Sequence, residues 1–78
     1  MINIQIPSLI FLRLSALYPQ KVLYIIVTLW DANKTTNEIL RDCAYVTKAE
    51  LRQITACYKE LFSRKDSKWS FILKDSLM

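Results

Sequence analysis

The strongest constraint on the fold is a helix-start signal that occurs twice. Thr35 and Glu38 form a Thr-x-x-Glu capping box, and Thr47 and Glu50 repeat it twelve positions later. In such a box the Thr hydroxyl accepts a hydrogen bond from a free backbone N–H of the first turn, and the Glu side chain accepts one from the Thr N–H. Twelve positions leave room for a short helix, a turn and a new helix start. The sequence therefore predicts two consecutive helices joined by a tight turn.

Apolar spacing sets the expected extent of these two helices. The first should run from Thr36 to about Cys43, followed by a turn in which Val46 packs near Leu51 as a hydrophobic staple. The second should run from Lys48 to about Leu61. Its inward residues are spaced three, four and three positions apart: Leu51, Ile54, Tyr58 and Leu61.

Two further helices are expected before this pair. Pro7 suits the first position of a helix ending near Tyr18, and Pro19 separates it from a central core helix over residues 20–31. Trp30, near the end of that helix, is expected to be a core anchor, with a binding platform as the alternative. The N-terminal helix is apolar on more than one side, which fits either a sandwiched core helix or a contact with a second subunit. Residues 2–6 alternate in hydrophobicity and predict a short strand or an extended arm.

After residue 61 the apolar period changes from helical to alternating. Phe62 and Arg64 should share one face with Trp69, Phe71 and Leu73, on either side of a turn at residues 66–67. This pattern predicts a β-hairpin with a basic tip, whereas residues 31–35 are expected to form a loop. The predicted fold class is thus mainly α with a small β-hairpin, an α+β domain.

Composition excludes several classes of function. The chain has 78 residues, no His and no Gly, so it lacks the usual general base, the commonest metal ligand and any glycine-rich phosphate loop. We expect no enzyme activity, metal or cofactor. Cys43 and Cys57 lack metal-site spacing and are expected to be free, partly buried thiols in the cytoplasm, with a disulfide as the alternative. The longest apolar run, residues 22–30, is shorter than the about 20 residues of a membrane span.

The order of helix, helix, turn, helix and basic hairpin resembles the winged helix-turn-helix superfamily of DNA-binding domains, in particular small bacterial or mobile-element transcriptional regulators. The segments that carry the resemblance are KVLYIIVTLW, TTNEIL, VTKAELRQI and RKDSKWSFIL. It implies one domain over residues 1–78, with an arm and helix at 1–18, a three-helix core at 19–62 and a wing at 63–74. Many members have a Gly between recognition helix and wing; here the passage reads YKELFSR, so the helix either runs longer or ends without a left-handed cap.

The resemblance implies a DNA-binding transcriptional regulator whose recognition helix, about residues 47–61, enters the major groove of double-stranded DNA. Arg52 and Gln53 are the best candidates for base contacts, because Arg pairs in bidentate fashion with guanine and Gln with adenine. The remaining expected DNA-binding residues hold phosphates or the adjacent groove: Thr47, Lys48, Thr55, Lys59, Arg64, Lys65 and Lys68.

Charge supports this interpretation only modestly and leaves a second one open. The net charge of the chain is +4, and six basic against three acidic residues between positions 48 and 68 give a local net charge of +3. A dimer formed through the apolar N-terminal segment, or a partner regulator, would strengthen the binding. The alternative is a winged-helix interaction module that binds another protein. A continuous basic surface favours DNA, whereas interruption by Glu50 and Glu60 beside an apolar patch favours protein.

Overall fold

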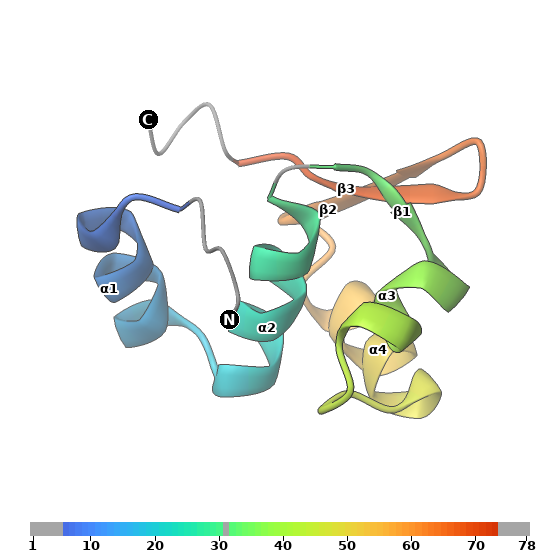
Figure 1. The fold of residues 1–78 in the computed structure, drawn as a ribbon, viewed down its shortest axis with the longest axis horizontal. Helices are drawn as coiled ribbons and strands as arrows, with labels where there is room; N and C mark the ends of the chain where they lie inside the picture. Colours follow the sequence, from blue (N-terminus) through green and yellow to red (C-terminus); the bar gives the residue numbers. More distant parts are fainter. Residues whose placement is uncertain (1–5, 31, 74–78) are drawn as a thin grey trace.

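The computed structural model describes residues 6–30 and 32–73 and confirms the predicted α+β class. These residues form four helices and a three-stranded antiparallel sheet (Figure 1). The elements are α1 (Ser8–Leu17), α2 (Gln20–Leu29), β1 (Lys34–Thr35), α3 (Thr36–Asp42), α4 (Lys48–Cys57), β2 (Phe62–Lys65) and β3 (Lys68–Phe71).

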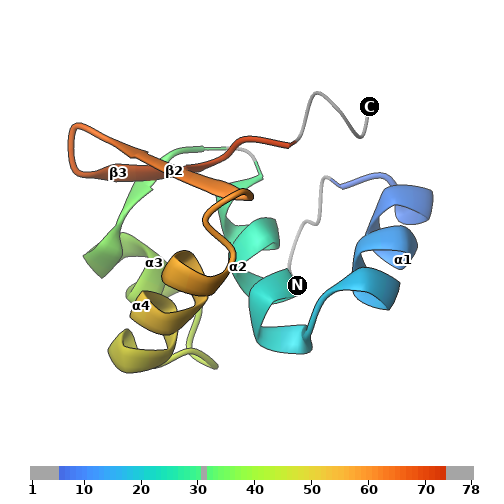
Figure 2. The ribbon, with the colours of Figure 1, turned by 180° about the vertical axis from the view of Figure 1, so that it is seen from behind.

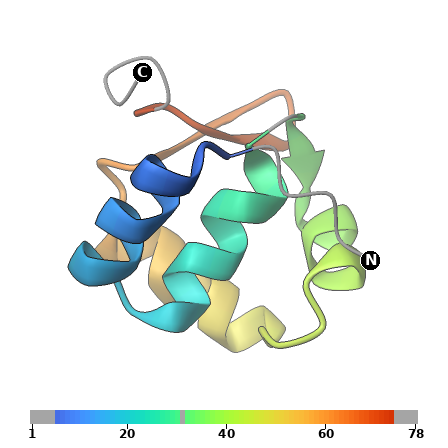
Figure 3. The ribbon, with the colours of Figure 1, turned by 60° about the vertical axis from the view of Figure 1, so that its left-hand side comes forward.

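Helix α2 lies at the centre of the molecule. Helix α1 packs on one side of it, α3 and α4 lie on the other, and the sheet crosses one end (Figures 1 and 2). Viewed from the α1 side, α1 and α2 lie next to each other in front of α4 (Figure 3). Trp30, directly after α2, is 5% exposed, which confirms its role as a core anchor. The buried residues of α2 itself are Val22, Leu23, Ile25, Ile26 and Leu29.

Both predicted capping boxes are present. The Oγ1 atom of Thr35 accepts a hydrogen bond from the Glu38 N–H at 3.2 Å, and the Thr35 N–H donates to Glu38 Oε1 at 2.9 Å. The Thr47 box repeats this geometry at 3.2 and 3.0 Å. Between α3 and α4, Val46 is buried in the same core as Leu51, on the first turn of α4. Local sequence alone therefore positions the starts of α3 and α4.

Helix α4 ends at Cys57, four residues before the predicted end at Leu61. Tyr58 has φ −114° and ψ 42°, outside the helical region, and its ring packs edge-on against Tyr18 at a centroid distance of 5.9 Å. A tight turn follows, in which the Leu61 N–H donates to the Tyr58 carbonyl. The helix thus ends without a left-handed cap, and Leu61 is fully buried from a turn. Of the other residues expected to be buried, Leu51 is buried whereas Ile54 and Tyr58 are half-buried.

Strands β2 and β3 form the predicted hairpin. Phe62 pairs with Phe71 and Arg64 pairs with Trp69, so both pairs lie on one face, as the alternation predicts. The turn consists of Asp66 and Ser67, with φ of 53° and 68°, the pattern of a type I′ turn.

A third strand was not predicted. Residues 34 and 35, expected to belong to a loop, form β1 and pair with β3 in the order β1-β3-β2. Lys34 lies opposite Trp69, and Thr35, which also caps α3, lies opposite Lys68. A two-residue strand has too few residues to show an alternating pattern, and it forms here because β3 offers a free edge.

Helix α1 starts at Ser8, one residue later than predicted, with Pro7 preceding it as the capping residue. Leu14 is its one fully buried residue. Leu9, Leu12 and Leu17 are 78%, 63% and 65% exposed. Among the described residues, α1 is therefore covered on one side only and is not the sandwiched core helix that was one of the two expectations. The predicted strand or arm at residues 2–6 lies, apart from residue 6, outside the described residues.

Two smaller expectations concern thiols and membranes. Both cysteines are free; Cys43 is buried as predicted, and burial raises the pKa of its thiol, whereas Cys57 is exposed. None of the helices in residues 6–30 and 32–73 has the length and apolar character needed to cross a bilayer.

Candidate nucleic-acid interface

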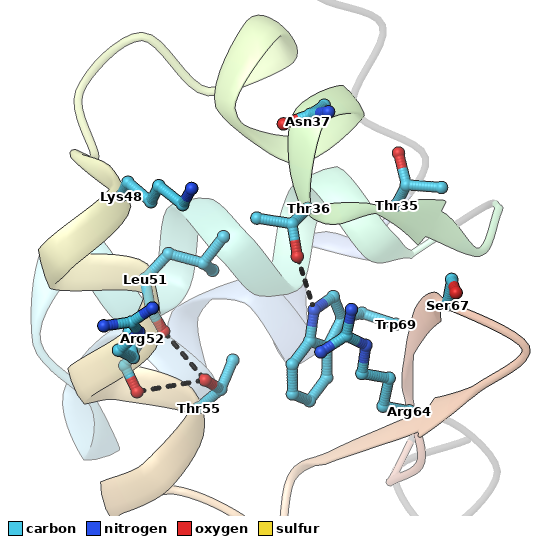
Figure 4. Close-up of a pocket in the computed structure, with 10 residues that line it drawn as sticks. All are labelled: Thr35, Thr36, Asn37, Lys48, Leu51, Arg52, Thr55, Arg64, Ser67 and Trp69. Carbon is cyan, nitrogen blue, oxygen red and sulfur yellow. Dashed lines mark hydrogen bonds between the residues drawn. The ribbon is translucent and has the colours of Figure 1, made fainter.

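An open groove of about 540 Å³ lies between α4, the start of α3 and the β2–β3 hairpin. Lys48, Arg52 and Thr55 line it from α4, and Arg64 and Trp69 line it from the hairpin (Figure 4). Residues 35–37 close the third side. The groove thus joins the two segments that the sequence predicts to contact DNA.

Three cations meet in this groove. Lys48 and Arg52 are one helical turn apart on α4, and Arg64 faces the groove from β2 (Figure 4). No carboxylate belongs to the lining, and no carboxylate of residues 6–30 and 32–73 forms an ion pair with these three side chains. Their positive charges therefore remain available to an anionic ligand.

Arg64 is held against an aromatic ring. Its guanidinium carbon lies 5.5 Å from the centre of the Trp69 ring, a cation–π distance. Trp69 is half-buried, and its Nε1–H donates a hydrogen bond to Thr36 Oγ1 at 3.2 Å. The indole connects the hairpin to the first residue of α3, so the ring on which Arg64 stacks is itself anchored.

The acidic residue of α4 is directed away from the groove. Glu50 forms an ion pair with Lys21 of α2 and accepts the N–H of Thr47. These interactions, with Lys21 first, lower the pKa of Glu50 from its usual 4.5 to about 2. Glu60 is exposed in the turn after α4 and is not part of the groove lining. Glu50 and Glu60 were expected to indicate a protein partner if they interrupted the basic surface. Neither belongs to the groove lining, so the groove itself is basic.

The groove brings together four of the nine predicted contact residues. Lys48, Arg52, Thr55 and Arg64 line it, although the Thr55 hydroxyl already donates to the Leu51 carbonyl at 2.9 Å. The other five do not belong to its lining.

Gln53 is exposed but outside the groove lining, since successive helix residues point about 100° apart. Of the two residues predicted to contact bases, Arg52 therefore lines the groove and Gln53 does not. Lys59, predicted within the recognition helix, lies in the turn that follows α4. The Thr47 hydroxyl acts as the cap of α4.

Lys65 and Lys68 flank the turn of the hairpin as directly opposed, exposed cross-strand partners. Like charges at opposed positions destabilise a strand pair, and a bound anion relieves that repulsion. Lys68 also contributes, after hydrogen bonds from Thr35, to the lowered pKa of Glu38. The tip of the hairpin is thus basic, as predicted.

Trp69 is the groove residue whose role the sequence did not indicate. It was predicted to share a face of the hairpin with Phe71, and of these two residues only Phe71 is buried. The alternation that places Arg64 and Trp69 on one face already contained the signal, because opposed residues on a face are neighbours.

Chemically, the arrangement suits binding of a phosphate-bearing polymer. Three cations and several threonine hydroxyls line the groove, and Lys, Arg and Thr side chains bind phosphate oxygens in protein–DNA interfaces. Comparison of this chain with protein-family models, curated proteins and solved structures finds no match.

Proposed function

We propose that this chain is a winged helix-turn-helix protein that binds double-stranded DNA and regulates transcription. In this proposal α3 and α4 form the helix-turn-helix, α4 is the recognition helix and the β2–β3 hairpin is the wing. The observation that carries the proposal is the convergence of Lys48, Arg52 and Arg64 on one groove without a carboxylate in its lining.

Each cation has a role that follows from its position. Arg52, in the second turn of α4, reaches base edges in the major groove, where its fork pairs with guanine. Lys48, at the start of α4, and Arg64, on β2, bind phosphates on either side of it. Lys65 and Lys68 extend the phosphate contacts to the hairpin tip.

A second surface supports association of two copies. Leu9, Leu12 and Leu17 are exposed on α1, and α1 lies on the other side of α2 from α3 and α4 (Figure 1). Two copies joined through α1 would leave both α4 helices free to bind separate half-sites, and the second site would raise the effective affinity of the first.

The test is fluorescence anisotropy of labelled duplex DNA across a range of salt concentrations. Binding through phosphates gives a logarithmic affinity that falls linearly with the logarithm of salt, and the slope counts the contacts. The double variant Lys48→Gln/Arg64→Gln should lower that slope by about two contacts. Arg13→Gln, an exposed change on α1 that removes the same kind of charge, should leave it unchanged. Absence of binding at low salt, or equal losses in both variants, would overturn the proposal.

The exposed leucines of α1 favour one other function, that of a protein-binding module. In that case Leu9→Gln/Leu12→Gln should abolish capture of a partner protein while the groove variants leave it intact. If the chain is instead a DNA-binding dimer, the same leucine variant should convert it to a monomer in analytical ultracentrifugation and weaken DNA binding without changing the base preference.

A further inference from the structure

We propose that Trp69 is a positioning residue, which holds Arg64 ready as the fixed phosphate-binding group of the groove. The inference rests on the proposed function for its ligand, a DNA phosphate, but the positioning itself is a property of the free protein.

The first argument is the chain of contacts that ends at Arg64. Lys34 of β1 pairs with Trp69 of β3, and the indole Nε1–H donates to Thr36 Oγ1 at 3.2 Å. The main chain of Trp69 is thereby held by β1, and its indole is held by the start of α3. Arg64 pairs with Trp69 across the hairpin, and its guanidinium lies 5.5 Å from the ring centre.

The second argument is the contrast with the other two cations. Within the described ranges, no hydrogen bond or ion pair holds the charged end of Lys48 or Arg52. Those long side chains lose rotamer freedom only when a ligand binds, whereas Arg64 has already lost part of it on folding. A guanidinium stacked on a ring still directs its N–H donors outward, in the plane that matches a phosphate.

The third argument is the place of the stack in the groove. Arg64 and Trp69 both line it, opposite Arg52, and Figure 4 shows the guanidinium beside the indole, whose N–H is bonded to Thr36. A phosphate held by Arg64 would therefore fix the distance between the DNA backbone and α4. Trp69 itself needs no contact with DNA in this arrangement.

A double-mutant cycle on DNA affinity tests the coupling. The variants are Arg64→Ala, Trp69→Leu and both together, with Thr36→Val as a change that keeps the shape and removes only the acceptor of the indole N–H. If Trp69 acts through Arg64, the double variant should bind no more weakly than Arg64→Ala, with a coupling of about 2- to 150-fold. The salt slope should fall by about one contact in each single variant and by no more in the double variant. The inference would be overturned if the fold losses of affinity in the two single variants multiply in the double variant, or if their decreases in salt slope add.

A measurement without DNA separates this inference from the proposed function. In ¹⁵N relaxation of the arginine Nε–Hε groups, Arg64 should be more restricted than Arg52 in the free protein. Trp69→Leu should make the two alike, Trp69→Phe should keep part of the restriction, and Thr36→Val should reduce it. Equal mobility of Arg64 and Arg52 in the unmodified protein would overturn the inference.

If the protein fails to bind DNA but Arg64 is restricted, the proposed function fails and the positioning stands. Should Trp69→Leu not fold, Trp69→Phe and Thr36→Val decide the result.

Discussion

Helices α1 and α4 have the same length, ten residues, and each buries a single leucine completely, Leu14 and Leu51. Their other faces differ. Helix α1 exposes leucines and has Arg13 as its one charged residue, whereas α4 exposes Lys48 and Arg52 toward a groove. They lie on opposite sides of α2 (Figure 1).

The helices differ also in how their starts are specified. Helix α4 has a complete capping box, whereas Pro7 at the start of α1 makes no side-chain capping bond. Each helix is thus anchored by one buried leucine, although the exposed side of α1 is apolar and that of α4 carries cations. The core fixes where a helix lies, and the residues outside the core determine which partner it suits.

The largest expected effect tests the similarity between the helices. Leu14→Ala and Leu51→Ala should each lower the free energy of unfolding by about 2–5 kcal/mol, because each empties a closed site in the core. Chemical denaturation measures both. A loss below about 1 kcal/mol for either variant would show that its helix is held by other contacts.

The second prediction tests the difference between the free faces. Arg52→Ala should cost about 1–3 kcal/mol of DNA-binding free energy and relax the base preference at one position. Arg13→Ala, at the α1 side, should change neither. Binding titrations against a panel of single-base variants give both quantities. Unchanged affinity and preference for Arg52→Ala would remove it from the base-reading role.

The third prediction concerns helix starts. Thr47→Ala should lower the free energy of unfolding by about 1 kcal/mol, since it removes the acceptor for the Glu50 N–H. Ser8→Ala, in the first turn of α1, removes no capping bond and should change stability by less than about 0.5 kcal/mol. Thermal or chemical unfolding of both variants provides the comparison, and equal losses would refute the importance of the box.

A smaller effect is expected at the hairpin tip. Lys65→Ala should weaken binding to all DNA sequences alike and reduce the salt slope by about one, because the residue binds a phosphate in the proposed complex. Anisotropy on two unrelated duplexes checks this. A loss confined to one sequence would mean that the wing reads bases.

The smallest effect links α4 to α2 through pH. The pKa of Glu50 is about 2 when folded, below its usual 4.5. Its contribution to stability is therefore complete above pH 4.5 and is lost as the pH falls toward 2. Denaturation midpoints across this range should fall more steeply for the unmodified protein than for Glu50→Gln. Parallel curves would show that the pair with Lys21 contributes no stability, as is common for exposed ion pairs.

The parts of this fold that were predictable are those specified by neighbouring residues. The two capping boxes, the turn at Asp66 and Ser67 and the paired faces of the hairpin each follow from spacings of a few positions. The end of α4 does not, because Tyr58 leaves the helix to pack against Tyr18, forty positions earlier in the chain.

The candidate site divides in the same way. Lys48, Arg52 and Arg64 were recognisable as exposed cations on the correct elements. That they share one groove, and that Gln53 does not line it, depends on how α4 meets the hairpin. Strand β1 and the bond from Trp69 to Thr36 join segments about thirty positions apart, and no local pattern encodes them.

The turn of the hairpin has a consequence for how this chain tolerates change. Asp66 and Ser67 both adopt positive φ, which costs a residue with a Cβ roughly 1–2 kcal/mol relative to glycine-like freedom. The chain contains no glycine at all. The hairpin therefore retains a reserve of stability that a single substitution, Ser67→Gly, would release. The substitution changes one residue of the groove lining but none of its three cations. If other substitutions destabilised the protein, for instance substitutions in α4 that alter the base preference, Ser67→Gly could compensate for the lost stability.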